Sequence, residues 1–185
     1  VGSPSHVGVL DMTAFVNTKN VTSDLPDVQF HFFQYRMGEA KRLRTVLDNY
    51  GYDENINESI MSGIKKSELL MAMVVLLRPK SKGKIELRSS DPLDKPRIYG
   101  NYLEEIEDVE TLIRGISVIK RVVAAKTSRE HECFFMKVNI TGCAHVEFDK
   151  PGYWECYVRH MTSTVYHPTS SNSMGPDSNA VSDDD

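Results

Sequence analysis

Residues Leu76–Leu103 read LLRPKSKGKIELRSSDPLDKPRIYGNYL, and this stretch decides how the chain is expected to fold. An apolar run at residues 73–77 leads into it and predicts a buried strand. Residues 78–83 (RPKSKG) interrupt the run with proline, glycine and cationic side chains, which is turn chemistry. Residues 84–89 (KIELRS) alternate polar and apolar positions, so one face should be buried and the other wet. The two segments together predict an antiparallel hairpin with Leu87 on its buried face.

The same stretch leads into a long amphipathic helix. Residues 90–96 contain two prolines and form a second break, and residues 97–99 are a short extended piece. Asn101 is expected to cap a helix over Tyr102–Lys126, in which apolar residues recur at every third or fourth position. Acidic residues occupy its first turns and basic residues the later ones, which is the order the helix dipole favours. This pattern predicts a helix packed on a core rather than a site.

Taken in order, these pieces resemble the glucose–methanol–choline (GMC) family of flavin oxidoreductases, in particular its insect glucose-dehydrogenase-like branch. The resemblance is carried by RPKS-G, a strand ending in R-S-x-D-P, then P-R-I, N-Y-L and TLIRGI. It extends over roughly residues 8–177, through PDVQFHF at 26–32 and YWECYVRHMTSTVYHP at 153–168. The resemblance implies an FAD-dependent oxidoreductase acting on CH–OH groups of alcohols or sugars, with this chain as part of its substrate domain.

The N-terminal half adds strands and one undetermined segment. Residues 9–17 and 27–35 are rich in β-branched and aromatic residues and predict two strands, with a loop at residues 22–26. Residues 36–66 are the least determined segment, in which a short charged helix over 39–49 is followed by irregular chain at residues 50–57. That segment is either a solvated connection or, as the resemblance implies, a flap over the approach to the flavin.

The C-terminal third predicts one further helix and an unstructured end. Residues 127–150 are loop-like, and Pro151-Gly152 is expected to begin a helix over Tyr153–Thr162. Residues 172–185 contain mostly Ser, Asn, Gly and Asp and are expected to be disordered.

The expected fold class is α+β, an antiparallel sheet of about five strands with helices packed on one face. Residues 8–166 are expected to form a GMC-type substrate domain, which is partial. Residues 167–185 would carry a degenerate catalytic-histidine motif and the disordered tail.

Composition excludes some classes of partner. With a net charge of −4 and a pI near 5.9 over 185 residues, nothing favours a nucleic-acid or anionic-membrane partner. No apolar run approaches the roughly 20 residues of a membrane-spanning helix. The expected partner is a small-molecule alcohol or sugar substrate, as the resemblance implies.

Cysteines and sequons bear on the compartment. The chain contains three cysteines, Cys133, Cys143 and Cys156. No C-x-x-C pair occurs, and no metal site is expected. Either all three are reduced thiols, or one disulfide forms, for which Cys143 and Cys156 are the favoured pair. Three N-x-S/T sequons occur, at Asn20, Asn57 and Asn139. Together these features favour a secreted or extracellular protein.

His167, which precedes Pro168, is the candidate catalytic residue. Taken alone, it reads as a surface or packing histidine. In the resembled family, a helix ending in T-x-Y-H-P-x-G-T-C-x-M-G-P brings this histidine to the flavin, where it handles the proton of the substrate hydroxyl. Met174-Gly175-Pro176 also match that motif. An imidazole has the right pKa to accept such a proton near neutrality.

The chain departs from the family pattern in two places. Residues 168–173 read PTSSNS where the family carries a Gly-Thr-Cys core, and glycine allows a close backbone approach to a flat ring. None of the 11 glycines forms a G-x-G, so the fingerprint that seats the ADP half of FAD is absent, and with it the FAD-binding domain. We therefore expect the isolated chain to bind no FAD and to be inactive.

Two functions fit these observations. The first is a substrate-domain fragment of an FAD-dependent dehydrogenase or oxidase, with His167 as the inherited proton acceptor. The second is a truncated, non-catalytic relative that serves as a binding or structural module, or the product of an incomplete gene.

Overall fold

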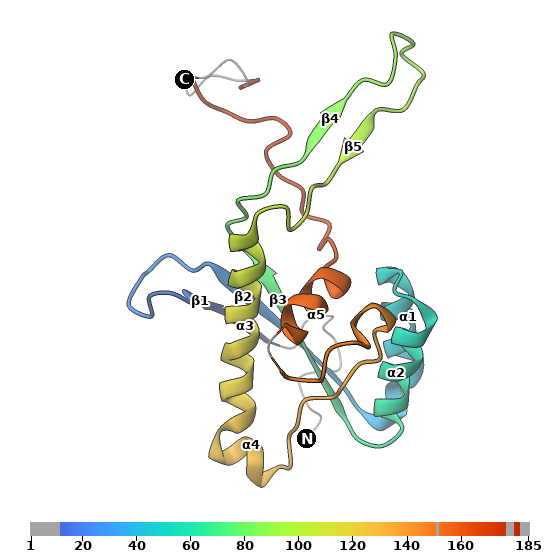
Figure 1. Ribbon diagram of the computed structural model, residues 1–185, viewed down its shortest axis with the longest axis vertical. Helices are drawn as coiled ribbons and strands as arrows, with labels where there is room; N and C mark the ends of the chain where they lie inside the picture. Colours follow the sequence, from blue (N-terminus) through green and yellow to red (C-terminus); the bar gives the residue numbers. More distant parts are fainter. Residues whose placement is uncertain (1–11, 151, 177–179, 182–185) are drawn as a thin grey trace, which may run out of the picture. The chain divides into compact units, whose positions relative to one another are not determined.

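The computed structural model describes residues 12–150, 152–176 and 180–181, and these residues contain both helices and antiparallel strands (Figure 1). The chain divides into two compact units. One unit comprises Val1–Ser81 with Leu103–Met161, and the other comprises Lys82–Tyr102 with Thr162–Asp185. The mixed content of helix and strand confirms the expected α+β class.

The first unit is built on a three-stranded sheet. Its strands are β1 (Met12–Val16), β2 (Val28–Tyr35) and β3 (Leu69–Leu76). They lie in the order β1-β2-β3, and both pairings are antiparallel. The two strands predicted near the N-terminus are therefore confirmed, apart from residues 9–11, which lie outside the described residues.

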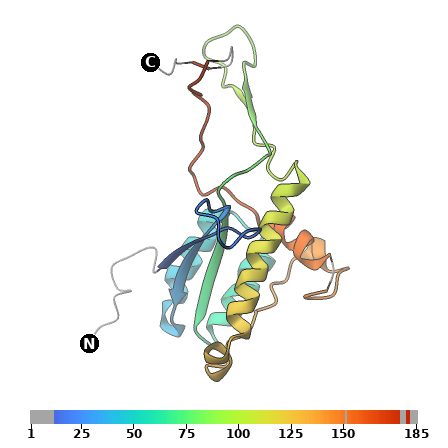
Figure 2. The same cartoon turned by 90° about the vertical axis from the view of Figure 1, so that its left-hand side faces the viewer.

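The helix α3 (Ile106–Ala124) covers one face of this sheet (Figure 2). Val28, Phe30 and Phe32 alternate along β2 and are buried, and Val118 and Ile119 of α3 pack against them. Alternation places these three side chains on the same face of the strand, which is why one helix can cover them all. The predicted helix is confirmed, although it begins four residues later than expected.

A second helix, α5 (Tyr153–Met161), packs against α3. Val158 of α5 is buried in a cluster with Val109, Leu112 and Ile116 of α3. Trp154 and Tyr157 pack against this cluster, and their rings contact those of Phe135, Phe148 and Tyr153. The second predicted helix is thus confirmed from Tyr153, while Pro151 lies outside the described residues.

The segment 36–66 is largely helical: the expected helix over 39–49 is confirmed, whereas of the stretch 50–57 expected to be irregular only residues 51–53 are non-helical. It contains a short 3-10 turn, η2 (Met37–Glu39), then α1 (Ala40–Tyr50) and α2 (Glu54–Ile64). The buried apolar residues of α2 are Ile56, Ile60 and Ile64, which follow one another at intervals of four. That spacing places them on one side of a helix, where they pack with Leu43 and Leu47 of α1.

The expectation of one sheet of about five strands was wrong, because the strands form two sheets. The second sheet pairs β4 (Lys84–Glu86) with β5 (Arg97–Tyr99). The predicted hairpin between residues 73–77 and 84–89 does not form: β3 pairs with β2 along one edge, and β4 pairs with β5 rather than with the other edge of β3. Ala72, Val74 and Leu76 of β3 can be covered together with the buried face of β2, whereas every residue of β4 is exposed.

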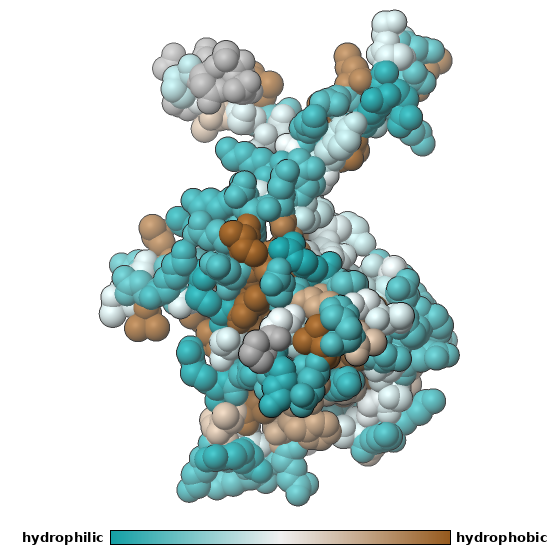
Figure 3. Space-filling model, in the orientation of Figure 1, coloured by the Kyte–Doolittle hydropathy of each residue, from teal (hydrophilic) through white to brown (hydrophobic). Residues whose placement is uncertain are grey.

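Leu87 was also misplaced, since its side chain is 86% exposed and lies beyond the end of β4. Other large apolar residues of the second unit are exposed as well, including Ile85, Leu93 and Ile98. On the segment that carries β4 and β5, hydrophobic surface stands among hydrophilic surface (Figure 3). This unit therefore buries little apolar surface of its own.

Two local expectations need correction. The region 127–150 is not all loop, because it includes most of the short helix α4 (Lys126–Glu130) and the 3-10 turn η3 (Thr141–Cys143). Asn101 does not cap α3, whose N-cap is Glu105. Asn101 instead has a positive φ of 48° and donates from Nδ2 to Lys82 O at 3.0 Å.

Candidate functional site

The structure places the predicted catalytic histidine on an exposed coil. His167 lies beyond the end of α5, in the second unit, and has no hydrogen-bond or ion-pair partner among the described residues. Tyr166 before it has a positive φ of 61° and donates its backbone N–H to Thr164 Oγ1 at 3.0 Å. The chain thus turns sharply just ahead of the imidazole and leaves both ring nitrogens free to bind another molecule.

The rest of the motif continues on the same exposed coil. Met174 is 70% exposed, and the backbone N–H of Val181 donates to Ser173 O at 2.9 Å. Residues 177–179 and 182–185 lie outside the described residues, so disorder of the tail stays a prediction. Among the described residues, no hydrogen bond or ion pair holds the imidazole of His167 in place.

In the first unit, the sheet face opposite α3 carries polar and apolar side chains together. Register places His31 between Thr13 and Met73, and Phe15 beside Gln29. Gln29 Nε2 donates to Thr13 Oγ1 at 3.0 Å, while the Phe15 side chain is 58% exposed. Sequence reasoning did not single out these residues, although alternation along the predicted strand already assigns Gln29 and His31 to one face.

A cavity of about 690 Å³ opens at the end of this face, beside α1. Phe33 and Tyr35 of β2 line it together with Arg42 and Tyr50 of α1. The Arg42 guanidinium lies 4.9 Å from the centre of the Tyr35 ring and donates to Gln34 O at 3.2 Å. Aromatic walls with a fixed cation beside them suit a small organic ligand that carries polar groups.

Charge at the rim of this cavity is balanced. The Glu39 carboxylate accepts the backbone N–H of Arg36 at 2.9 Å, and this hydrogen bond is the largest effect that lowers the pKa of Glu39. Burial acts in the opposite direction, and the Arg42 guanidinium at 3.2 Å lowers the pKa further. The carboxylate therefore stays ionised and offsets the charge of Arg42.

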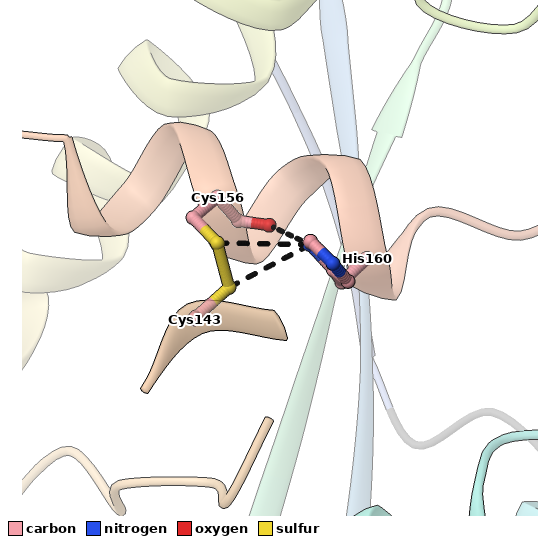
Figure 4. A group of neighbouring side chains, drawn as sticks. All are labelled: Cys143, Cys156 and His160. Atoms are coloured by element: carbon pink, nitrogen blue, oxygen red, sulfur yellow. Dashed lines mark hydrogen bonds between the residues drawn. A yellow bond between two sulfur atoms is a disulfide. The ribbon is translucent and has the colours of Figure 1, made fainter. Parts of the chain in front are cut away.

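A third feature is the disulfide between Cys143 and Cys156, which ties η3 to α5 and confirms the favoured pairing. His160, one turn further along α5, points at the two sulfurs, with Nδ1 at 3.6 Å from Cys143 Sγ and 3.7 Å from Cys156 Sγ (Figure 4). Its Nδ1 lies 2.8 Å from the carbonyl oxygen of Cys156, which only accepts, so Nδ1 carries the proton.

Two cysteines and a histidine are a familiar set of metal ligands, and here their ligand atoms lie within 4.8 Å of one another. A metal, however, is bound by a thiolate, and sulfurs joined in a disulfide are not thiolates. In this oxidised state the cluster is a structural crosslink. The remaining cysteine, Cys133, is free and exposed.

Two tyrosines are held in apolar surroundings near this crosslink. Burial raises the pKa of Tyr52 to about 12, and the neighbouring Tyr50 adds a smaller effect in the same direction. The Tyr52 hydroxyl donates to Met161 O at 3.0 Å. Burial likewise raises the pKa of Tyr157 far above its usual range. Both phenols are thus neutral near pH 7 and do not serve as proton acceptors.

The described residues do not fit the ADP half of FAD. All strand pairings in the part of the chain that the structure describes are antiparallel, so that part holds no parallel strand–helix–strand unit with a glycine-rich turn. Nor is any described helix long and apolar enough to cross a membrane.

Comparison with known proteins agrees with the motifs. The family model described as GMC oxidoreductase matches residues 79–185, which is more than half of the chain. The chain is 33% identical over 176 residues to the glucose dehydrogenase (FAD, quinone) of Drosophila pseudoobscura pseudoobscura. The aligned region is 95% of this chain and 26% of that protein.

Two further relatives differ in their named substrates. The alcohol dehydrogenase (acceptor) of Pseudomonas putida is 31% identical over 160 residues, covering 86% of this chain and 24% of that protein. The ecdysone oxidase of Bombyx mori is 26% identical over 125 residues, covering 68% of this chain and 18% of that protein. The chain spans about a quarter, or less, of the length of these curated relatives.

The predicted resemblance, insect glucose dehydrogenases included, is therefore confirmed by the family match and by the insect relatives. The matched residues contain the β4–β5 arm, α3, α5 and the His167 motif. The chain belongs to the GMC oxidoreductase family.

Proposed function

We propose that this chain is the substrate-domain part of an FAD-dependent oxidoreductase that acts on CH–OH groups of alcohols or sugars. The observation that carries the proposal is the family match over residues 79–185, which includes His167 and the Met174-Gly175-Pro176 sequence that follows it. The relatives named above act, by their names, on glucose, an alcohol or ecdysone, and each of these substrates carries a hydroxyl group.

In this proposal His167 accepts the proton of the substrate hydroxyl. Such a role needs an imidazole nitrogen that no protein group already occupies, and His167 is exposed with no partner among the described residues. The chain's own contribution is this proton acceptor. The described residues provide no seat for FAD, so we assign the chain no step that involves the cofactor.

Substrate contact is proposed for the sheet face opposite α3. Thr13, Gln29 and His31 offer hydrogen-bonding groups to hydroxyls, and Phe15 and Phe33 offer apolar surface to a carbon skeleton. The cavity beside Arg42 continues that face, which makes it a natural place for the polar end of a sugar or alcohol.

Location outside the cytosol is also part of the proposal. Disulfides persist in oxidising compartments and are rare in the cytosol. The Cys143–Cys156 crosslink therefore supports a secreted or extracellular protein.

The test is a chimera in which residues 8–177 replace the matching segment of the Drosophila pseudoobscura glucose dehydrogenase. Its readout is quinone reduction that depends on glucose. We expect weak activity, which His167→Ala lowers by about 10²- to 10⁴-fold, the usual contribution of a positioned general base. His131→Ala is the matched control, because His131 is exposed and its side chain has no partner among the described residues.

A second candidate is favoured by the chain between His167 and Met174. Its PTSSNS sequence replaces the Gly-Thr-Cys core of the resembled motif, which places side chains where a close approach to a flat ring is needed. A non-catalytic binding or structural module would then be the function. If this second function is correct, the chimera should fold and bind flavin but be inactive. It should also gain no activity when Gly-Thr-Cys replaces Ser170-Ser171-Asn172. Equal activity of the chimera and its His167→Ala variant would refute the catalytic role of His167.

A further inference from the structure

The three sequons differ in how the folded chain presents them. N-glycosylation joins an oligosaccharide to the amide nitrogen of asparagine, so that nitrogen must reach solvent in the finished protein. Asn20 and Asn139 are exposed, whereas the Asn57 side chain is only 3% exposed. Because the three sequences look equally acceptable, only the fold distinguishes them.

Asn20 lies in the turn that joins β1 to β2. Its side-chain oxygen accepts the hydroxyl of Thr22 at 2.8 Å and the backbone N–H of Thr22 at 3.1 Å. The turn is closed by a hydrogen bond from Ser23 N–H to Asn20 O at 3.0 Å. The amide oxygen is thus occupied, while the amide nitrogen has no acceptor among the described residues.

Asn139 is presented by alternation along an extended segment. Val138 is 7% exposed and Ile140 is 4% exposed, so the side chain between them points outward. The backbone of Asn139 is fixed on both sides, since its N–H donates to Ser59 Oγ at 3.0 Å and its carbonyl accepts from Asn55 Nδ2 at 3.1 Å. The segment holds the side chain outward without using its amide group.

Asn57 is presented in the opposite way. It lies on α2 between the buried residues Ile56 and Ile60, and its Nδ2 donates to Tyr52 O at 3.2 Å. An oligosaccharide on that nitrogen would displace this hydrogen bond and have to pass through the packed core between α1 and α2. A chain modified there could not adopt this fold.

N-glycans are attached in the secretory pathway, and the disulfide is an independent observation that points to the same compartment. Cys143 and Cys156 are crosslinked, and crosslinks of this kind form in the oxidising secretory pathway, where N-glycans are also attached. We propose that Asn20 and Asn139 are N-glycosylation sites and that Asn57 is not. This proposal is independent of whether the chain takes part in catalysis.

The chemistry is a group transfer without oxidation or reduction. The donor is an oligosaccharide linked to a polyprenyl diphosphate. A bond forms between asparagine Nδ2 and the anomeric carbon of the sugar, and the bond from that carbon to the phosphate oxygen breaks. The polyprenyl diphosphate leaves with the electron pair, and the amide gives up one proton. The β1–β2 turn and the Asn139 segment would then face solvent in any assembly that the chain enters.

The test directs the full chain, residues 1–185, into the secretory pathway of insect cells with an added signal peptide. Total and secreted protein are treated with peptide N-glycosidase, which converts a glycosylated asparagine to aspartate, and peptides are mapped by mass spectrometry. We expect conversion at Asn20 and Asn139 and none at Asn57. Chain expressed without the signal peptide is the control and should show no conversion.

Variants give a second readout by gel mobility. Asn20→Gln and Asn139→Gln should each remove one glycan, and the double variant should migrate like enzymatically deglycosylated chain. Ser59→Ala destroys the third sequon without altering Asn57, but it also removes the acceptor of the Asn139 N–H, so Asn57→Gln, which keeps that acceptor, is made beside it; both should leave the mobility unchanged. An unmodified Asn20 or Asn139 would overturn the assignment of that site, and a glycan on Asn57 in secreted chain would overturn the burial argument. The peptide map of the parent decides the matter even if a variant fails to fold.

Discussion

The buried carboxylate of Asp108, in the first turn of α3, accepts the backbone N–H of Ser81 at 2.8 Å. It also accepts the N–H of Lys80 at 2.8 Å, and the Ser81 hydroxyl accepts the N–H of Glu105 at 3.0 Å. The RPKS segment thus ends β3 by binding the start of α3. Its N–H groups are used there rather than in a tight hairpin turn, which explains why β3 and β4 do not pair.

Loss of this carboxylate is expected to destabilise the first unit. Asp108→Asn keeps the shape but offers only one oxygen to two N–H groups, so we expect a cost of about 1.5–3 kcal/mol in the free energy of unfolding. Burial alone would raise the pKa of Asp108, but the N–H groups of Lys80 and Ser81 outweigh it and hold the pKa below its usual value.

A carboxyl group whose pKa is lowered by folding stabilises the fold above its unfolded pKa of about 3.9, and this contribution is lost as the pH falls through the folded value. The difference between parent and Asp108→Asn should therefore be full at pH 7 and shrink below about pH 4. Urea unfolding followed by the fluorescence of Trp154 measures it. Glu110→Gln, an exposed position on the same helix, should change stability by less than about 0.5 kcal/mol at both pH values. A stability difference between parent and Asp108→Asn that does not depend on pH would show that the Asp108 carboxylate is not stabilised by these N–H groups.

Gly115 allows α3 to approach the sheet closely. A Cβ added there would overlap Val74 Cγ1 and crowd Val28. Gly115→Ala should gain helix propensity but lose about 1–3 kcal/mol through overpacking, because a β-branched valine has little freedom to move. Thermal unfolding of the parent and of Gly115→Ala measures the net effect of these two contributions on stability.

Gly63→Ala is the matched comparison for Gly115. There the added Cβ would meet the sulfur of Met136, which is the far end of a flexible side chain. We expect the smaller loss at Gly63, and equal losses at the two positions would show that α3 is free to shift away from the sheet.

The Cys143–Cys156 crosslink should contribute measurably to stability. Its two cysteines are 13 residues apart, and closing a loop of this size is worth about 3 kcal/mol in the chain-entropy account. The double variant Cys143→Ser/Cys156→Ser should therefore unfold at lower urea than the parent, and reduction of the parent should reproduce that shift. Cys133→Ser should behave like the parent, since Cys133 is free and exposed. If the urea midpoint of the parent is the same with and without reductant, the crosslink does not form in solution.

Leu87→Asp is expected to be nearly neutral in the 185-residue chain. The Leu87 side chain is 86% exposed, so a carboxylate there keeps its water and should change stability by less than about 0.5 kcal/mol. Leu112→Asp, at a position that is 7% exposed in α3, should cost several kcal/mol because its carboxylate must be desolvated. Comparable urea midpoints for the two variants would show that the arm containing Leu87 is buried after all.

Much of the local structure was predictable from sequence. The stripe of α3, the alternation of β2 and the aromatic face of α5 are periodic over short distances, and periodicity reports which side of an element is buried. The motif order around RPKS and His167 was sufficient to identify the family. The spacing of Ile56, Ile60 and Ile64 was also visible and would have predicted α2, had the polar residues between them not been read as irregular chain.

Only the tertiary structure decided which strands pair and which polar groups are buried. Val28 lies beside Leu76 across 48 residues of chain, and no local pattern states that β3 pairs with β2 rather than with β4. Asp108 looks in sequence like the acidic residues around it, yet it alone among them is buried, because the N–H groups that satisfy it come from a distant turn. Asn20 and Asn57 are likewise equivalent as sequons and opposite in exposure. Local propensity acts over a few residues, whereas strand pairing and burial depend on which distant groups share a contact, and that is settled only when the whole chain packs.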